Sequence, residues 1–250
     1  MNAMHRSILC TCLALTALSM ATAVHAGVEI DGTRVIFNEG MPEATIRVKN
    51  PGSTPVLLQS WVDTLTESAS PTTTKAPFVL LPPISRAEPG KSQVLRMKIA
   101  SGNLPRDKES AFWLNVLEVP AIKADQSQGD GYLQVTVRNR LKIFYRPKGL
   151  DARGAGRAAA NVQWRLLPQI NGVALQAKND SPYHVSMVKA WLVEGQKETE
   201  AQGMQMLVPY STTSFTVPGV GRLPSNATLK VRYINDFGGV VNTTLPLSSP

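Results

Sequence analysis

The sequence predicts an all-β protein, because short strand-like runs alternate with turn residues and helical periodicity is scarce. Runs rich in β-branched residues recur along the chain between clusters of Gly, Pro, Asn and Ser, which is the pattern of an antiparallel sandwich. No segment shows a long 3.6-residue hydrophobic period. Hydrophobic residues make up 43% of the 250-residue chain, which excludes a disordered or collagen-like protein.

The first block of predicted strands closes at the Pro-Lys-Gly turn of residues 147–149. The segment 44–49 (Ala-Thr-Ile-Arg-Val-Lys) alternates apolar and polar residues, so one face of this strand should be buried and the other hydrated. The clearest strands of this block are 28–37, 43–49, 56–62 and 94–99.

A second block of strands follows residue 160. The Ala-rich piece 153–160 is the one helical candidate, but Gly154 and Gly156 favour a linker there. We therefore expect two β-sandwich domains, 27–148 and 149–250, of about 120 and 100 residues, each a usual size for a domain. The predicted strands of the second block are 162–167, 173–178, 185–193, 214–217 and 229–234.

Residues 1–26 have the layout of a secretory signal peptide. Arg6 precedes an apolar run at 8–20, and the triplet Val-His-Ala at 24–26 places small residues at the third and last positions before a cleavage site. The run of about 13 apolar residues is too short to span a bilayer, which needs about 20. We expect cleavage after Ala26, an exported protein and no stable membrane insertion.

The motifs argue against an enzyme. Cleavage would remove both cysteines and leave His184 as the single histidine, which excludes a Cys nucleophile and a two-histidine metal centre. The Gly-Lys-Ser of residues 90–92 lacks the first glycine of a phosphate loop, because position 85 is Ser85. No Gly-x-Ser-x-Gly elbow occurs, and we expect His184 to be a strand residue rather than a catalytic base. We predict no catalytic residue, no metal and no cofactor.

The segment 132–147 is the most informative part of the chain and about twice as long as a typical strand. Leu133, Val135 and Val137 alternate with polar residues in its first half. A strand edge with such an apolar set can pair with another chain, the β-augmentation mode of recognition. The alternative is that the same three side chains face the core of their own domain.

The charge of the chain is basic, with 26 Lys and Arg against 18 Asp and Glu, which suggests an acidic or carboxylate partner. A nucleic-acid binder would use such a basic stripe. Export and the interleaved apolar residues argue against nucleic acid as the partner. The stripe consists of Arg138, Arg140, Lys142, Arg146 and Lys148.

Seven motifs together resemble the PapD-like periplasmic chaperones of the chaperone-usher pathway, and the resemblance covers essentially the whole predicted mature chain. It implies two immunoglobulin-like β-sandwich domains in a boomerang arrangement. It also implies a periplasmic protein that caps fimbrial or pilus subunits by donor-strand complementation and delivers them to an outer-membrane usher. The motifs are 33–37 (Thr-Arg-Val-Ile-Phe), 81–83 (Leu-Pro-Pro), 88–90 (Glu-Pro-Gly), 104–110 (Leu-Pro-Arg-Asp-Lys-Glu-Ser), 112–116 (Phe-Trp-Leu-Asn-Val), 141–147 (Leu-Lys-Ile-Phe-Tyr-Arg-Pro) and 233–239 (Tyr-Ile-Asn-Asp-Phe-Gly-Gly).

The resemblance implies roles for single residues. Arg34 and Lys142 match two basic residues of the interdomain cleft that anchor the C-terminal carboxylate of the subunit, to which two desolvated cations would make charge-assisted hydrogen bonds. Leu133, Val135 and Val137 match the residues that fill the groove of a subunit lacking its last strand. Lys142 has the opposite parity, so either a bulge near 138–140 resets the strand faces or the cleft is reached from the other face.

Other matches concern the arrangement of the domains. Arg96, Glu109, Arg146 and Asp236 match a charge network that holds the two domains at a fixed angle, the alternative being ordinary surface ion pairs. The Leu81-Pro82 bond is a candidate for a cis peptide. The connection 120–131 places the chain with the short-loop, rod-type branch of the family. A homodimer of self-capping free chaperones and an exported basic β-sandwich that binds another carboxylate or polyanionic ligand remain open.

Overall fold

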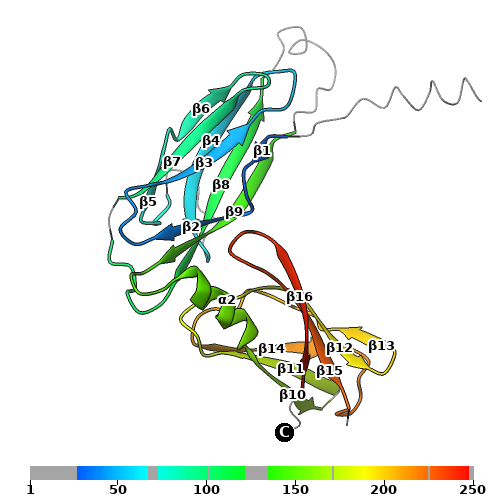
Figure 1. Cartoon of the computed structure of the whole chain (residues 1–250). Coiled ribbons are helices and arrows are strands. Elements are labelled where there is room, and N and C mark those ends of the chain that lie inside the picture. The colour runs from blue at the N-terminus through cyan, green and yellow to red at the C-terminus, as the bar shows by residue number, and fades with distance from the viewer. Residues whose placement is uncertain are drawn as a thin grey trace, which may run out of the picture.

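The computed structural model describes residues 27–66, 73–100, 102–121, 135–170, 172–224 and 226–247. These residues form two β-sandwiches that meet at an angle, with one short helix beside the junction (Figure 1). The predicted all-β class with two sandwich domains is confirmed. In this part of the chain, no helix is long and apolar enough to cross a membrane.

The N-terminal sandwich packs two sheets face to face. Its core is built from the inward-facing residues of both sheets, among them Phe37, Leu58 and Leu114. One sheet has the order β1 (Glu29–Ile30), β3 (Ala44–Lys49), β7 (Ser92–Ile99) and β5 (Phe78–Leu81). The other has the order β2 (Arg34–Asn38), β9 (Val137–Arg146), β8 (Ser110–Pro120), β4 (Val56–Thr64) and β6 (Ile84–Ala87).

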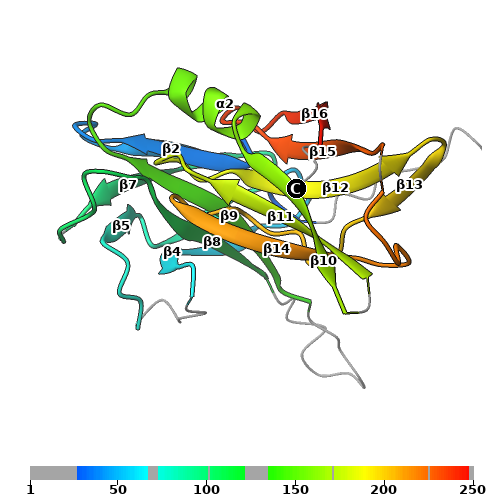
Figure 2. The same ribbon diagram turned by 90° about the horizontal axis from the view of Figure 1, so that it is seen from below.

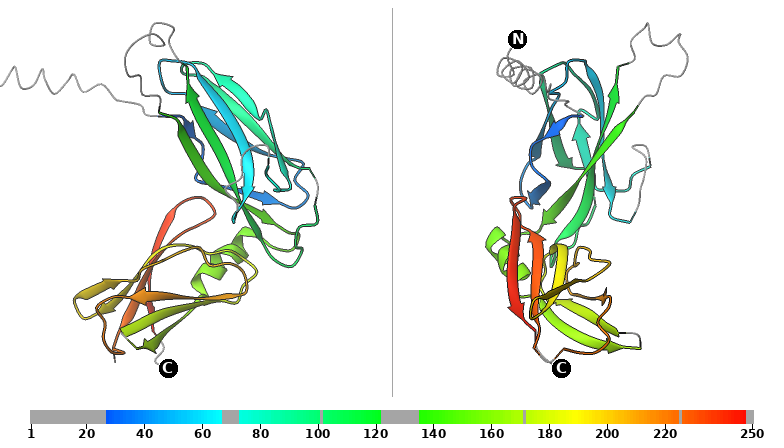
Figure 3. Two further views of the ribbon diagram at one scale, coloured as in Figure 1. Left: turned by 180° about the vertical axis from the view of Figure 1, so that it is seen from behind. Right: turned by 90° about the vertical axis from the view of Figure 1, so that its right-hand side faces the viewer.

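The C-terminal sandwich has the same two-layer construction, seen from below in Figure 2. Its core includes Trp164, Leu175 and Phe215. One sheet has the order β10 (Gln163–Gln169), β11 (Gly172–Asn179) and β14 (Ser211–Val217). The other has the order β13 (Lys197–Glu200), β12 (Ser186–Glu194), β15 (Thr228–Ile234) and β16 (Val240–Pro246). The turn between β15 and β16 reaches toward the N-terminal sandwich (Figure 3).

The predicted single strand 28–37 is in fact two strands that belong to different sheets. β1 pairs with β3, whereas β2 runs parallel to β9 in the opposite sheet, and the crossing lies at Gly32 with φ of +85°. The β2 partner begins only at Lys142, so residues 137–141 of β9 have no strand on that side among the described residues. The first half of β9 is therefore a free sheet edge.

Residues 153–160 are not a linker, because they belong to helix α2 (Ala152–Ala160). The carboxylate of Asp151 caps the helix by accepting the Gly154 N–H at 2.6 Å. A Cβ on Gly154 would overlap the hydroxyl of Tyr183. The glycine that argued against a helix is thus the residue that lets the helix pack closely on the C-terminal domain.

The Leu81-Pro82 peptide bond is cis, as the sequence suggested. Residues 122–134 are not among the described residues. They include most of the connection 120–131, which was used to predict the short-loop branch, and Leu133. The structure therefore leaves the loop type and the position of Leu133 as predictions.

Candidate functional site

Arg34 and Lys142 lie side by side where the N-terminal sandwich meets the C-terminal one. They are direct partners in the parallel ladder of β2 and β9, so their side chains share one sheet face. The same row continues from Lys142 to Trp113 on β8 and to Asp63 on β4. The structure thus brings the two predicted anchor residues together, and it adds a tryptophan next to them that the sequence analysis did not assign.

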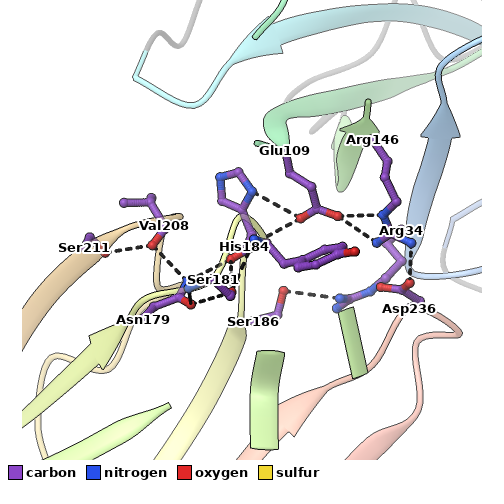
Figure 4. A network of polar contacts seen from close by, with 11 residues as sticks. Arg34, Glu109, Arg146, Asn179, Ser181, His184, Ser186, Val208, Ser211 and Asp236 are labelled. Carbon is purple, nitrogen blue, oxygen red and sulfur yellow. Dashed lines mark hydrogen bonds and ion pairs between the residues drawn. The ribbon is translucent and has the colours of Figure 1, made fainter. Parts of the chain in front are cut away.

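Arg34 bridges the two domains. Its Nη1 donates to Ser186 Oγ at 3.2 Å (Figure 4). The same nitrogen donates to the Ile234 carbonyl at 3.3 Å, and both acceptors belong to the C-terminal domain. The guanidinium also lies 5.7 Å from the centre of the Phe144 ring. Burial lowers the pKa of Arg34, while the charge of Asp236 acts in the opposite direction. Because an arginine stays protonated in proteins, the cleft holds a fixed positive charge here.

Lys142 is a half-buried cation with no anion beside it. Its Nζ lies 5.6 Å from the centre of the Trp113 ring, and it has no acidic or hydrogen-bonding partner among the described residues. Burial lowers the pKa of Lys142, and the neighbouring charge of Arg34 lowers it further. An anion bound between the two side chains would compensate both effects, so the pair is suited to hold a carboxylate.

Arg146, Glu109 and Asp236 form one ion-pair network across the domain junction. Arg146 Nη2 lies 2.7 Å from Glu109 Oε1 within the N-terminal domain, and Arg146 Nη1 donates to Asp236 Oδ2 at 2.8 Å in the β15–β16 turn (Figure 4). The side chains of Arg146 and Glu109 are each only 2% exposed. Such a shielded network constrains the relative position of the two elements that it joins.

The electrostatics of this network favour its charged forms. Burial by itself would raise the pKa of Glu109, but hydrogen bonds from His184 and the charge and hydrogen bonds of Arg146 outweigh it and hold that pKa below its ordinary value. Burial by itself would lower the pKa of Arg146, and Asp236 and Glu109 outweigh that effect in the same way.

His184 is a member of the network that the sequence analysis missed. Its backbone N–H donates to Glu109 Oε2 at 2.8 Å, and its Nδ1 lies 3.4 Å from the same oxygen. The imidazole is 5% exposed and packs 5.6 Å from the centre of the Phe144 ring. His184 lies two residues before β12 and is not itself a strand residue, contrary to the expectation from the sequence, and it joins the beginning of that strand to the N-terminal domain.

Arg96 does not join this network, and that prediction is wrong. Its guanidinium is engaged by Glu43, with nitrogen–oxygen distances of 2.7 to 2.9 Å, on the exposed surface. The physical reason is sheet membership. Arg96 lies on β7, whereas Glu109 precedes β8 and Arg146 ends β9 in the opposite sheet.

Val137 is the first residue of β9, at its free edge, and Val135 lies two residues before the strand. Val135 is 61% exposed and Val137 is 39% exposed. The pairing of β8 with β9 runs without interruption from Ser110 opposite Tyr145 to Glu118 opposite Val137, so the bulge considered for residues 138–140 is absent. Val137 therefore shares the core-facing side of the strand with the buried Leu141 and Ile143, and Lys142 projects from the other face. Val137 extends this apolar row beyond the part that is buried.

A cavity of about 290 Å³ lies between the domains next to α2. Arg34 and Phe144 line it from the N-terminal domain, and Ser186 and Tyr233 line it from the C-terminal domain. The described residues contain no cluster of His, Cys, Asp and Glu that could hold a metal ion. The chemistry that this junction offers is the binding of an anion next to a free strand edge.

Comparison with known proteins gives a consistent result across the chain. Residues 27–151 match the family "Pili and flagellar-assembly chaperone, PapD N-terminal domain", and residues 157–245 match "Pili assembly chaperone PapD, C-terminal domain". The chaperone protein FimB/FhaD of Bordetella pertussis is 43% identical over 231 residues, covering 89% of this chain and 88% of the relative. The probable fimbrial chaperone YadV of Escherichia coli is 35% identical and is covered to 96%, as is this chain.

Solved structures agree with the sequence comparison. The crystal structure of the YadV chaperone aligns with a TM-score of 0.75 and 32% identity, over 89% of this chain and 100% of the other. The SafB chaperone in complex with the SafA pilin of Salmonella enterica aligns with a TM-score of 0.70 and 26% identity, over 91% and 99% of the two chains. The chain therefore belongs to the PapD family of pilus-assembly chaperones.

Proposed function

We propose that this protein binds fimbrial or pilus subunits in its interdomain cleft and holds their C-terminal carboxylate between Arg34 and Lys142. The observation that carries the proposal is the state of Lys142, a half-buried cation that faces a second cation and has no anion among the described residues. A protein that evolved only for stability gains nothing from two adjacent desolvated positive charges, whereas a carboxylate receptor needs them.

The free edge of β9 supplies the second part of the proposal. Residues 137–141 have no neighbouring strand on this edge among the described residues, and Val135 and Val137 offer exposed apolar surface at its start. Together with Leu133, they would complete the fold of a subunit that lacks its last strand, by donor-strand complementation. The exposure of the two valines supports this function over the alternative that they serve only the core of their own domain.

The network of Arg146, Glu109, His184 and Asp236 is assigned a positioning role. Its members come from both domains, and the hydrogen bonds of Arg34 to Ser186 and Ile234 add to it. The network would hold the two sides of the cleft at a fixed separation before a subunit binds, which lowers the entropic cost of binding.

The protein is assigned to the periplasm, after removal of residues 1–26, and to delivery of subunits to an outer-membrane usher. The family match and the predicted signal peptide support this placement. Binding rather than catalysis is the proposed activity. Binding of a subunit carboxylate by Lys142 can be tested without the usher, because the contact is made in the complex of chaperone and subunit.

The test is co-expression of this chain with the subunits encoded by its genomic neighbours, followed by purification of the complex. Lys142→Met keeps the length of the side chain and removes its charge, and Lys148→Met is the matched control at an exposed site near the end of the same strand. The proposal expects the complex to be lost with Lys142→Met and kept with Lys148→Met. Recovery of the complex with Lys142→Met at the wild-type level would refute the anchor.

A further inference from the structure

We propose that the cleft selects C-terminal segments that carry acidic side chains at alternate positions, and that Arg138 and Arg140 read these side chains. The inference rests on the proposed function, because the register of the bound segment is counted from the anchor formed by Arg34 and Lys142. It adds a specificity determinant to that anchor and defines the class of subunit that this chain accepts.

Three of the four basic residues of β9, those that precede the buried Arg146, lie on one face of the strand. Arg138, Arg140 and Lys142 occupy alternate positions, and the pairing with β8 is regular through all of them. Arg34 extends the row at the Lys142 end. Their neighbours on β8 are all uncharged: Leu117 opposite Arg138, Asn115 opposite Arg140 and Trp113 opposite Lys142. The result is a stripe of positive charge along the free edge.

Most cations on the other strands have an acidic partner, although Arg165, Lys197 and Arg232 have none among the described residues. Arg138 and Arg140 are exposed and have no carboxylate within ion-pair distance among the described residues. Arg140 stacks 4.7 Å from the centre of the Trp113 ring, which holds the guanidinium at the strand face without neutralising it. Ion pairs of cations on the other strands are Arg47–Asp31, Lys49–Glu29, Arg86–Glu88, Arg96–Glu43, Lys98–Glu43, Lys178–Asp180, Lys189–Glu200 and Lys230–Glu198.

The register of a bound strand follows from the geometry of β-sheets. A segment whose carboxylate lies at Lys142 and whose preceding residues pair with 137–141 runs in the same direction as β9, in line with β2. Strands share a rise of about 3.3 Å per residue, so every second residue of the segment meets every second residue of β9 on the same face. Counting back from the C-terminus, one set of alternate side chains therefore passes Arg140 and then Arg138.

An acidic side chain at each of these two positions would form a cross-strand ion pair. Opposite charges placed directly across a sheet stabilise the pairing modestly, which for two such pairs corresponds to roughly 2- to 30-fold in the dissociation constant. The interleaved side chains of the segment lie on the apolar side of Val135 and Val137. The accepted segment therefore alternates apolar and acidic residues up to its free carboxylate.

The test uses the mature full-length chain and three synthetic ten-residue peptides. Two peptides have the same composition and a free C-terminal carboxylate, with glutamates at the second and fourth positions from the C-terminus in one and at the first and third in the other. The third peptide repeats the better binder with an amidated C-terminus. Calorimetric titration gives the dissociation constants for the wild type, for Arg138→Gln with Arg140→Gln, and for the control pair Arg165→Gln with Arg222→Gln, which removes two exposed charges from the C-terminal domain.

The proposal expects one register of glutamates to bind roughly 2- to 30-fold more tightly than the other, and this preference to vanish in the Arg138 and Arg140 variant but not in the control pair. Equal binding of the two registers, or a preference that survives in the variant, would overturn it. Tight binding of single-stranded DNA that depends on the same two arginines would overturn it too, in favour of a polyanion site. Undiminished binding of the amidated peptide, or no binding of any peptide, would instead contradict the carboxylate anchor itself.

Discussion

Glu109 of the N-terminal domain accepts the backbone N–H of His184 of the C-terminal domain at 2.8 Å with one carboxylate oxygen, while its other oxygen pairs with Arg146. One side chain thus fixes both a charge within its own domain and a backbone position in the other domain. Because Glu109 contacts both domains, substitution of Glu109 is the most direct test of the interdomain network.

Glu109→Gln should destabilise the protein by about 3 kcal/mol, because breaking a buried ion pair leaves the charge of Arg146 only partly compensated. Urea denaturation followed by tryptophan fluorescence measures the change. Glu43→Gln is the control, since Glu43 pairs with Arg96 on the exposed surface and its loss should hardly change stability. Equal effects of the two substitutions would contradict the special position of Glu109.

The pH dependence of stability should show the lowered pKa of Glu109. A carboxyl whose pKa is lower in the folded state stabilises the protein fully above its unfolded pKa of about 4.3, and this stabilisation is lost as the pH falls through the folded value. The urea midpoint of the wild type should therefore fall below about pH 4.3 more steeply than that of Glu109→Gln. If the urea midpoints of the two proteins fell equally steeply below about pH 4.3, the lowered pKa of Glu109 would be contradicted.

Lys142→Met should make the free protein slightly more stable while it abolishes subunit binding. Since the pKa of Lys142 is lowered by burial and by Arg34, its charged form disfavours folding at neutral pH, and removing the charge relieves that cost. The gain should stay under about 1 kcal/mol, because solvent still screens a half-buried side chain. Thermal denaturation beside a subunit pull-down measures both effects, and a marked loss of stability would show that Lys142 is a structural residue.

Replacing both Val135 and Val137 with Asp should abolish subunit binding and leave the melting temperature of the free chaperone nearly unchanged. Val135 and Val137 are 61% and 39% exposed in the free protein, so charges there stay in contact with solvent, but in the complex the charges would enter an apolar groove. Val116→Asp serves as the control for a core position, because Val116 is fully buried, and it should prevent folding. A collapsed melting temperature of the double variant would remove the two valines from the binding surface.

Two glycines of α2 should respond in opposite ways to alanine. Gly154→Ala should destabilise the C-terminal domain by about 1 to 3 kcal/mol, because the new methyl group overlaps the Tyr183 hydroxyl. Gly156→Ala meets no atom within 4 Å and should stabilise the helix by up to about 1 kcal/mol. Denaturation of the two single variants gives the comparison, and the same sign for both would show that the helix does not pack as described.

The strands could be predicted from the sequence because their signal is local. The alternation in 44–49 appears in β3 as a regular succession of buried and exposed residues. The division of 28–37 into β1 and β2 could not be found in this way, since apolar residues continue on both sides of Gly32 and membership of a sheet depends on distant partners. Helix α2 was missed because Gly154 was judged by its helix propensity and not by its contact with Tyr183.

The charged site shows the same limit. The resemblance to PapD-like chaperones pointed to Arg34 and Lys142, which are direct partners in the sheet although 108 positions separate them in the sequence. The same resemblance assigned Arg96 to the interdomain network, but Arg96 lies on β7 in the opposite sheet, where Glu43 pairs with it. His184 contributes through its backbone N–H and through an Nδ1 that lies 3.4 Å from the same carboxylate oxygen. Both contacts join segments far apart in the sequence, so no local pattern could have identified them.

The free edge of β9 ends at Lys142, because β2 pairs with β9 from Arg34 onward. A foreign strand that pairs with residues 137–141 cannot continue past Lys142, because β2 already occupies the next stretch of the same edge. In the proposed complex, an internal segment of a partner would collide with β2. A chain terminus can end at this point, where Arg34 and Lys142 would bind its carboxylate. The passage of the chain from β1 in one sheet to β2 in the other would thereby make this sheet edge selective for the C-terminal end of a bound chain.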